Sequence, residues 1–144
     1  MALATTGQAE VMYLLDTNVI SELRRPRPHA GLVAWFSEIG ADEVFISAVT
    51  LGQLQAGVEN ARQHDPRRAE AIEAWIDGVA GSYGILPMDG RAFRFWARLM
   101  HGKPADLIAD AMIAATAAVH NLTVVTRNLR DFDRLGVAVF NPFR

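Results

Sequence analysis

Several acidic and amide side chains stand where they could hold a metal ion. Asp16 directly follows the apolar run at 11–15, and Asn128 and Asp131 follow the apolar run at 122–125. If both runs are parallel strands, their carboxyl ends meet at one edge of a sheet, which is where open α/β sheets bind ligands. Helix capping explains these three residues about as well, because Asp and Asn are favoured N-caps.

Asp110 is the acidic residue that a structural role explains least. It lies in the alanine-rich stretch 105–120, whose composition predicts a helix. Its neighbours on the same helical face are Ile113, Ala114 and Ala117. A carboxylate buried on such a small apolar stripe is costly unless it is paired or bound to a metal. We therefore expect a functional role for Asp110.

Together these side chains form an oxygen-rich set. We expect the acidic and amide groups to converge at the sheet edge, with Gln53 facing them; the set is Asp16, Asp110, Asn128 and Asp131. Carboxylate oxygens are the ligands that Mg²⁺ and Mn²⁺ prefer. Such an ion lowers the pKa of a bound water and neutralises charge that develops on a phosphoryl oxygen. The set indicates metal-assisted hydrolysis of a phosphodiester.

Alternating strands and helices would position these groups. Short apolar runs typical of buried strands occur at 11–15, 44–46, 85–86, 122–125 and 137–140. Longer stretches with helical spacing lie between them. This alternation predicts an α/β fold with right-handed crossovers, in which a mainly parallel sheet of about five strands is covered by helices on both faces.

Composition narrows the class of protein further. A chain of 144 residues predicts a single domain, which we place at 11–144. The absence of cysteine excludes a disulfide scaffold, a thiolate zinc site and a thiol nucleophile. Residues 1–10 lack the features of a signal peptide, and no apolar run could span a bilayer, so we expect a disordered tail and a cytoplasmic protein. A net charge of −2 argues against binding nucleic acid by bulk charge.

Four ordered segments carry a more specific pattern. They are LLDTNVISEL at 14–23, ISAVTLG at 46–52, ADAMIAATA at 109–117 and VVTRNLRDF at 124–132, completed by NPF at 141–143. In this order they resemble the PIN-domain family, and more closely its VapC-like toxins from bacterial toxin–antitoxin pairs. The resemblance covers about residues 12–143. It implies a three-layer α/β/α fold, dependence on Mg²⁺ or Mn²⁺, cleavage of RNA, homodimerisation and inhibition by a cognate antitoxin.

The acidic positions of the family map onto this chain one by one. The first falls at Asp16 and the third at Asp110, which the resemblance implies as metal ligands. The fourth falls at Asn128, and Asp131 three residues later keeps a carboxylate in the same loop. The second position, normally Glu between Gly and Leu, is Gln53. Gln keeps a carbonyl acceptor but carries no charge, so we expect weaker metal binding and weaker activity.

Basic residues beside the predicted acidic cleft could contact RNA phosphates. We predict this role for Arg24, Arg25, Arg127 and Arg130, although an ordinary solvated surface explains exposed arginines equally well. The main hypothesis is thus a metal-dependent endoribonuclease toxin. The alternative, which Gln53 favours, is a catalytically weak PIN-like protein that acts mainly by binding an antitoxin or RNA.

Other α/β proteins with an aspartate at the end of the first strand fit less well. The phosphatase pattern needs a second Asp two residues later, where this chain has Asn18. A phosphoacceptor receiver needs a lysine at the end of a later strand, and the single lysine, Lys103, precedes a helix. A dinucleotide-binding fold needs Gly-x-Gly-x-x-Gly after the first strand, and the sequence lacks it there.

Overall fold

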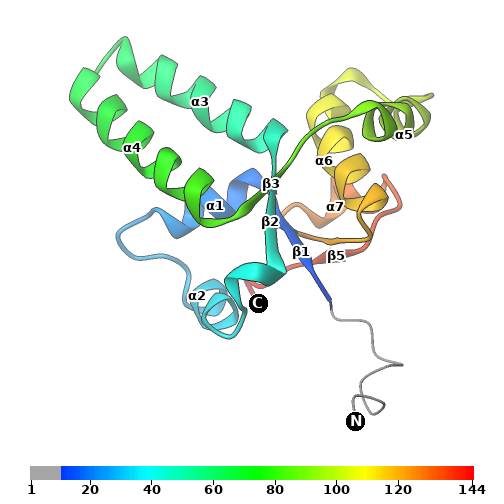
Figure 1. Cartoon of the computed structure of the whole chain (residues 1–144), viewed down its shortest axis with the longest axis horizontal. Coiled ribbons are helices and arrows are strands. Elements are labelled where there is room, and N and C mark those ends of the chain that lie inside the picture. The colour runs from blue at the N-terminus through cyan, green and yellow to red at the C-terminus, as the bar shows by residue number, and fades with distance from the viewer. Residues whose placement is uncertain (1–10) are drawn as a thin grey trace.

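A five-stranded parallel sheet organises the protein. The computed structural model describes residues 11–144, so the tail predicted at 1–10 lies outside the described residues. The sheet has the order β3-β2-β1-β4-β5 (Figure 1). Its strands are β1 (Tyr13–Leu15), β2 (Val44–Ser47), β3 (Gly84–Leu86), β4 (Thr123–Val125) and β5 (Val139–Phe140). All four neighbouring pairs run parallel, which confirms the predicted α/β class.

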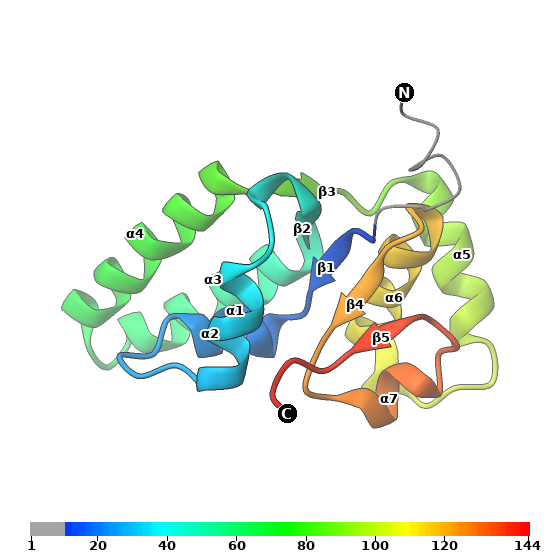
Figure 2. The ribbon, with the colours of Figure 1, turned by 90° about the horizontal axis from the view of Figure 1, so that it is seen from below.

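Helices cover both faces of this sheet. In the described part of the chain they are α1 (Thr17–Leu23), α2 (Ala30–Ser37), α3 (Ala48–Arg62), α4 (Pro66–Ser82), α5 (Gly90–Met100), α6 (Ile108–Val119) and α7 (Leu129–Asp133). Helices α1 and α2 lie on one side with the α3–α4 hairpin, and α5, α6 and α7 lie on the other (Figures 1 and 2). The predicted three layers are therefore confirmed. Across residues 11–144, no helix combines the length and apolar character needed to cross a membrane.

The central strand separates two hydrophobic cores. Leu14 packs with Val124 and Phe132 on one face, whereas Leu15 packs with Ile46 on the other. Successive strand residues point to opposite faces, so a strand between two helical layers must be apolar at every position. This explains the continuous apolar run at the start of the folded chain.

Helix α6 packs against the sheet through small side chains. The buried alanines are Ala111, Ala114, Ala115 and Ala117. The helix predicted at 105–120 begins instead as a 3-10 turn, η3 (Ala105–Leu107), and α6 itself starts at Ile108. Pro104 has an extended backbone immediately before this turn. As a result Asp110 stands in the first turn of α6.

The strand order places a topological switch point between β1 and β4. From β1 the chain passes outward to β2 and β3, then returns to the other side of β1 as β4 and β5. In open parallel sheets ligands bind beyond the carboxyl ends of the strands at such a point. Asp16 follows β1 and Thr126 follows β4, so both residues stand at this position.

Candidate active site

Asp16 is a buried carboxylate at the switch point. Its side chain Oδ1 accepts the backbone N–H of Thr17 at 2.8 Å, and Oδ2 accepts the hydroxyl of Thr126 at 2.9 Å. Burial raises the pKa of the Asp16 carboxyl, and the two hydrogen bonds partly oppose that effect. Capping of α1 uses only Oδ1. The second oxygen is held toward the end of β4, which capping does not require.

A chain of hydrogen bonds continues from Asp16 into the loop after β4. The buried Thr126 donates its hydroxyl to Asp16 and accepts the backbone N–H of Asn128 at 2.8 Å. Asn128 caps α7, and its Nδ2 donates to Oδ2 of Asp131 at 2.9 Å. Capping thus accounts for Asn128 in part. The same contacts fix the Asp131 carboxylate within this loop.

Asp110 experiences the electrostatic field of the other acidic residues. Desolvation, together with repulsion from Asp16, Asp131 and Asp106, raises its pKa to about 6. Its helical neighbours Ile113, Ala114 and Ala117 are buried, as the sequence pattern indicated. Asp16, Asp131 and Asp106 are therefore near enough to repel the Asp110 charge, and a bound cation would offset this repulsion.

Gln53 lies on α3 beside this edge. Its Oε1 accepts a hydrogen bond from the hydroxyl of Thr17, the residue that follows Asp16. Thr17 and Gln53 also line a cavity of about 320 Å³ between α1, α3 and α4. The Gln53 side chain is therefore directed toward α1 at the switch point, although the residue is exposed.

The donor set fits a hard divalent cation that keeps several waters. Across residues 11–144, no group of three acidic or histidine side chains is close enough together to form a ready-made metal cage. The available donors are the oxygens of Asp16 and Asp110, with Asp131 bonded to Asn128. Mg²⁺ commonly uses one or two protein carboxylates and completes its shell with water and substrate phosphates. Asp16 and Asp110 could supply those two carboxylates, and a cation would offset the repulsion between them.

Arg127 and Arg25, two of the arginines predicted to bind RNA, lie against a carboxylate that the sequence reasoning missed. Glu22 in α1 is only 8% exposed, and its Oε1 lies 3.5 Å from Nη2 of Arg127 and 3.7 Å from Nε of Arg25. The Arg127 guanidinium also stacks 3.9 Å from the centroid of the Phe143 ring. One sequence feature could have identified Glu22. It lies three residues after the apolar Val19, and residues at this spacing share one face of a helix.

The other two predicted arginines are exposed, as Arg25 and Arg127 are. Arg24 lies 5.9 Å from the centroid of the Trp75 ring and lines the cavity that contains Gln53. Arg130 is exposed on α7, one residue before Asp131.

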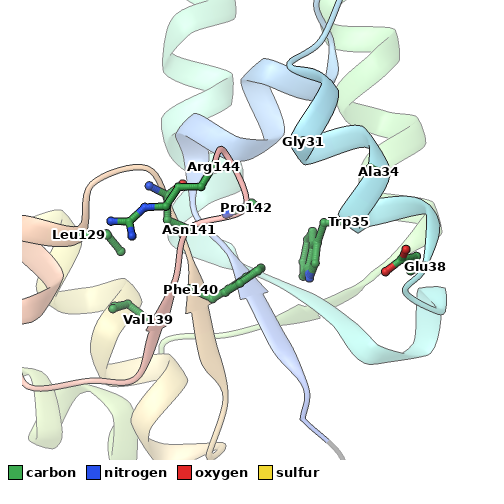
Figure 3. Close-up of a pocket in the computed structure, with 10 residues that line it drawn as sticks. All are labelled: Gly31, Ala34, Trp35, Glu38, Leu129, Val139, Phe140, Asn141, Pro142 and Arg144. Carbon is green, nitrogen blue, oxygen red and sulfur yellow. The ribbon is translucent and has the colours of Figure 1, made fainter.

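A larger cavity lies away from the predicted site. It has a volume of about 620 Å³ and opens between α2 and the C-terminal residues. Figure 3 shows Trp35 of α2 and Phe140 of β5 directed toward one another across it, with 5.4 Å between their ring centroids. None of the predicted catalytic or RNA-binding residues lines it. Cavity size alone therefore does not locate the acidic site.

Comparison with known proteins identifies the family. Residues 13–138 match the PIN domain. Toxin FitB of Neisseria gonorrhoeae is 39% identical over 140 residues, which cover 92% of this chain and 99% of FitB. The crystal structure of FitAcB from the same organism has a TM-score of 0.78 at 36% identity, with 92% and 99% of the two chains covered. The chain belongs to the PIN-domain family.

Two further relatives define its place in that family. VapC ribonuclease Y4jK of Sinorhizobium fredii is 33% identical over 141 residues, covering 92% of this chain and 98% of the relative. VapBC-5 of Mycobacterium tuberculosis, described as a member of the VapBC family of toxin–antitoxin systems, has a TM-score of 0.62 at 32% identity, with coverage of 92% and 98%. Within the PIN-domain proteins, this chain is one of the VapC-like toxins.

Proposed function

We propose that the protein is a metal-dependent endoribonuclease, the toxin of a toxin–antitoxin pair. The observation that carries the proposal is the buried Asp16 at the switch point of a parallel sheet, with Asp110 near enough for the charge of Asp16 to help raise its pKa. Similarity to a VapC ribonuclease over almost the whole chain supports RNA as the substrate. It also favours this function over the alternative of a protein that only binds an antitoxin or RNA.

Asp16 and Asp110 are the side chains that would hold the ion, which we propose to be Mg²⁺, with Mn²⁺ as the alternative. Such an ion supplies an activated water and neutralises charge on a phosphoryl oxygen. Thr126 fixes the orientation of the Asp16 carboxylate through its hydroxyl. We assign Asn128 and Asp131 to the catalytic set because their mutual hydrogen bond holds a second carboxylate toward Asp110.

With Gln53 in place of the glutamate usual at this position, the site carries one negative charge fewer. Its side chain contacts Thr17 next to Asp16, which is where the charge of a glutamate would add to the field of Asp16 and Asp110. The uncharged amide reduces repulsion within the site but attracts a dication less strongly. We therefore propose that the metal is bound weakly and that activity is correspondingly reduced.

The proposal includes the partners that such a toxin would meet. Exposed guanidinium groups suit contacts to RNA phosphates, and we keep Arg24, Arg25, Arg127 and Arg130 as candidates for that role. The relationship to a VapBC toxin–antitoxin system supports a cognate antitoxin as a partner. A homodimer and a cytoplasmic location complete the proposed state of the protein.

Cleavage of a circular RNA tests this function. Antitoxin-free protein should convert the circle to linear product with Mg²⁺ or Mn²⁺ and leave it intact in EDTA. Asp16→Asn and Asp110→Asn should each lower the rate by roughly a hundredfold or more. Asp133→Asn, an exposed acid on α7, serves as the matched control and should cleave like the wild type. Cleavage that persists in EDTA or in both site variants would overturn the proposal.

A further inference from the structure

A buried carboxylate outside the acidic site joins separate segments of the chain. Oε2 of Glu22 accepts the backbone N–H of His29 at 3.0 Å, while Oε1 faces the guanidinium of Arg127 at 3.5 Å. Burying an ionised carboxylate is costly unless it is paired and hydrogen-bonded. Glu22 therefore constrains both the loop before α2 and the Arg127 side chain.

The Arg127 guanidinium also packs against an aromatic ring, that of Phe143. The guanidinium carbon lies 3.9 Å from the ring centroid of Phe143, a separation at which cation–π attraction is favourable. The centroid of the Phe143 ring lies 5.2 Å from that of the His29 ring. The backbone N–H of Phe143 donates to Oδ1 of Asn141 at 2.9 Å. The guanidinium thus contacts both a buried anion and an aromatic ring that is itself packed.

The C-terminal segment that carries this ring is itself packed tightly. Figure 3 shows Asn141, Pro142 and Arg144 passing close to Gly31 at the start of α2. A Cβ added at Gly31 would lie 2.9 Å from the carbonyl oxygen of Pro142, which is closer than side-chain carbons approach. The Phe143 ring therefore has little freedom to move away from Arg127.

Arg127 lies between Thr126 and Asn128, two residues of the loop that orients Asp16. Its neighbour Thr126 orients the Asp16 carboxylate, and its other neighbour, Asn128, donates its backbone N–H to the Thr126 hydroxyl at 2.8 Å. The backbone N–H of Arg127 also donates to Oδ1 of Asn18 at 3.4 Å. Fixing the Arg127 side chain thus fixes the backbone between two residues that organise the site.

We propose that Glu22 and Arg127 are positioning residues, which clamp the loop after β4 against α1 and the C-terminal segment so that Thr126 holds Asp16 in its working orientation. This role rests on the proposed nuclease function and is an alternative to RNA contact for Arg127. Its guanidinium is already engaged by Glu22 and by Phe143. The Arg127 side chain is 54% exposed, so the experiments below must separate this role from a contact to an RNA phosphate.

Two near-isosteric substitutions test the clamp in protein free of metal and RNA. Glu22→Gln keeps an oxygen for the His29 N–H but removes the charge that holds Arg127, and Arg127→Gln removes the guanidinium. Amide hydrogen exchange, followed by NMR, should become about tenfold faster or more at Asn128 and Asp131 in both variants. Arg94→Gln, an exposed arginine on α5, is the charge-matched control and should leave these rates unchanged.

Steady-state RNA cleavage supplies the second readout. A loosened loop should lower kcat by roughly tenfold and leave KM within about twofold, since the binding surface for RNA is unchanged. A lost phosphate contact would instead raise KM and reduce the salt dependence of binding. Arg127→Lys keeps the positive charge but loses the planar stack on Phe143, so its exchange rates and kcat should be intermediate.

Each outcome decides the proposal. Unchanged exchange at Asn128 and Asp131 in both Glu22→Gln and Arg127→Gln would overturn it, as would a rise in KM at constant kcat. If Glu22→Gln fails to fold, Arg127→Lys and Arg127→Gln still provide the graded comparison. If the wild type cleaves no RNA, the proposed function fails, whereas hydrogen exchange still establishes whether the clamp orders the loop.

Discussion

Replacing Asp110 with asparagine should stabilise the metal-free protein at pH 7.5 while abolishing RNA cleavage. Burial and the charges of Asp16 and Asp131 raise the pKa of Asp110 to about 6 from an ordinary value of 3.8. The ionised carboxylate therefore works against folding at neutral pH. Asn has nearly the same shape and removes the charge, so the variant keeps the packing on α6 and relieves the repulsion.

The size of the effect follows from this pKa. The difference between 3.8 and about 6 corresponds to an upper limit of roughly 3 kcal/mol at neutral pH. Asp110 is only half-buried, and screening by solvent reduces the gain in unfolding free energy to about 1–2 kcal/mol. For a domain of this size, a gain of that order raises Tm by about 3–8 °C.

The dependence on pH distinguishes this cause from an improvement in packing. Because the pKa of Asp110 is raised in the folded protein, the wild type binds this proton more tightly when folded. Wild-type stability therefore increases as the pH falls through about 6 and is lost as the pH rises through the same range. The advantage of Asp110→Asn should shrink over this window and be mostly gone at pH 4.

Thermal unfolding in EDTA between pH 4 and 8 provides the assay. Asp106→Asn is the matched control, because Asp106 is exposed and adds only part of the repulsion at Asp110. Its Tm should rise by less than about 2 °C. An Asp110→Asn variant that melts at or below the wild-type temperature at pH 7.5 would refute the reasoning, and so would a gain that persists unchanged at pH 4.

Three other perturbations follow from the site. Gln53→Glu adds a charge next to Thr17 and should tighten Mn²⁺ binding by about ten- to a hundredfold in calorimetric titrations, with cleavage rising in parallel; equal affinity and equal rate would place Gln53 outside the metal's surroundings. Thr126→Val leaves Oδ2 of Asp16 without its hydroxyl donor and should cost about 1–3 kcal/mol in chemical denaturation, together with most of the activity; wild-type activity would contradict this. Arg130→Gln should raise KM severalfold at unchanged kcat and reduce the salt slope of RNA binding by about one; an unaltered slope would exclude a phosphate contact.

Much of the fold could be predicted because its determinants are local. The apolar run that forms β1 must face two helical layers, and burial of Leu14 and Leu15 in separate cores bears this out. Strand ends were less accessible to sequence reasoning. β5 covers only Val139–Phe140, since an apolar run indicates burial but does not specify where ladder hydrogen bonds begin.

The site was predictable to the extent that single residues broke a pattern. Asp110 stood out as a charge on an apolar helical stripe, and the structure gives it a raised pKa for that reason. Glu22 could not be paired with Arg127 in advance, because 105 positions separate them and only the parallel arrangement of β1 and β4 brings them together. For the same reason, sequence proximity to the acidic loop suggested RNA contact for Arg127 but could not reveal its pairing with Glu22.

The position of a bound metal ion tests the central claim most directly. Crystals of the wild-type protein soaked in Mn²⁺ at pH 7.5, with diffraction recorded at the manganese absorption edge, locate the ion by its anomalous signal. The account predicts a peak about 2.0–2.3 Å from carboxylate oxygens of both Asp16 and Asp110. The absence of a peak between these side chains at saturating Mn²⁺, or an ion held by other residues, would contradict it.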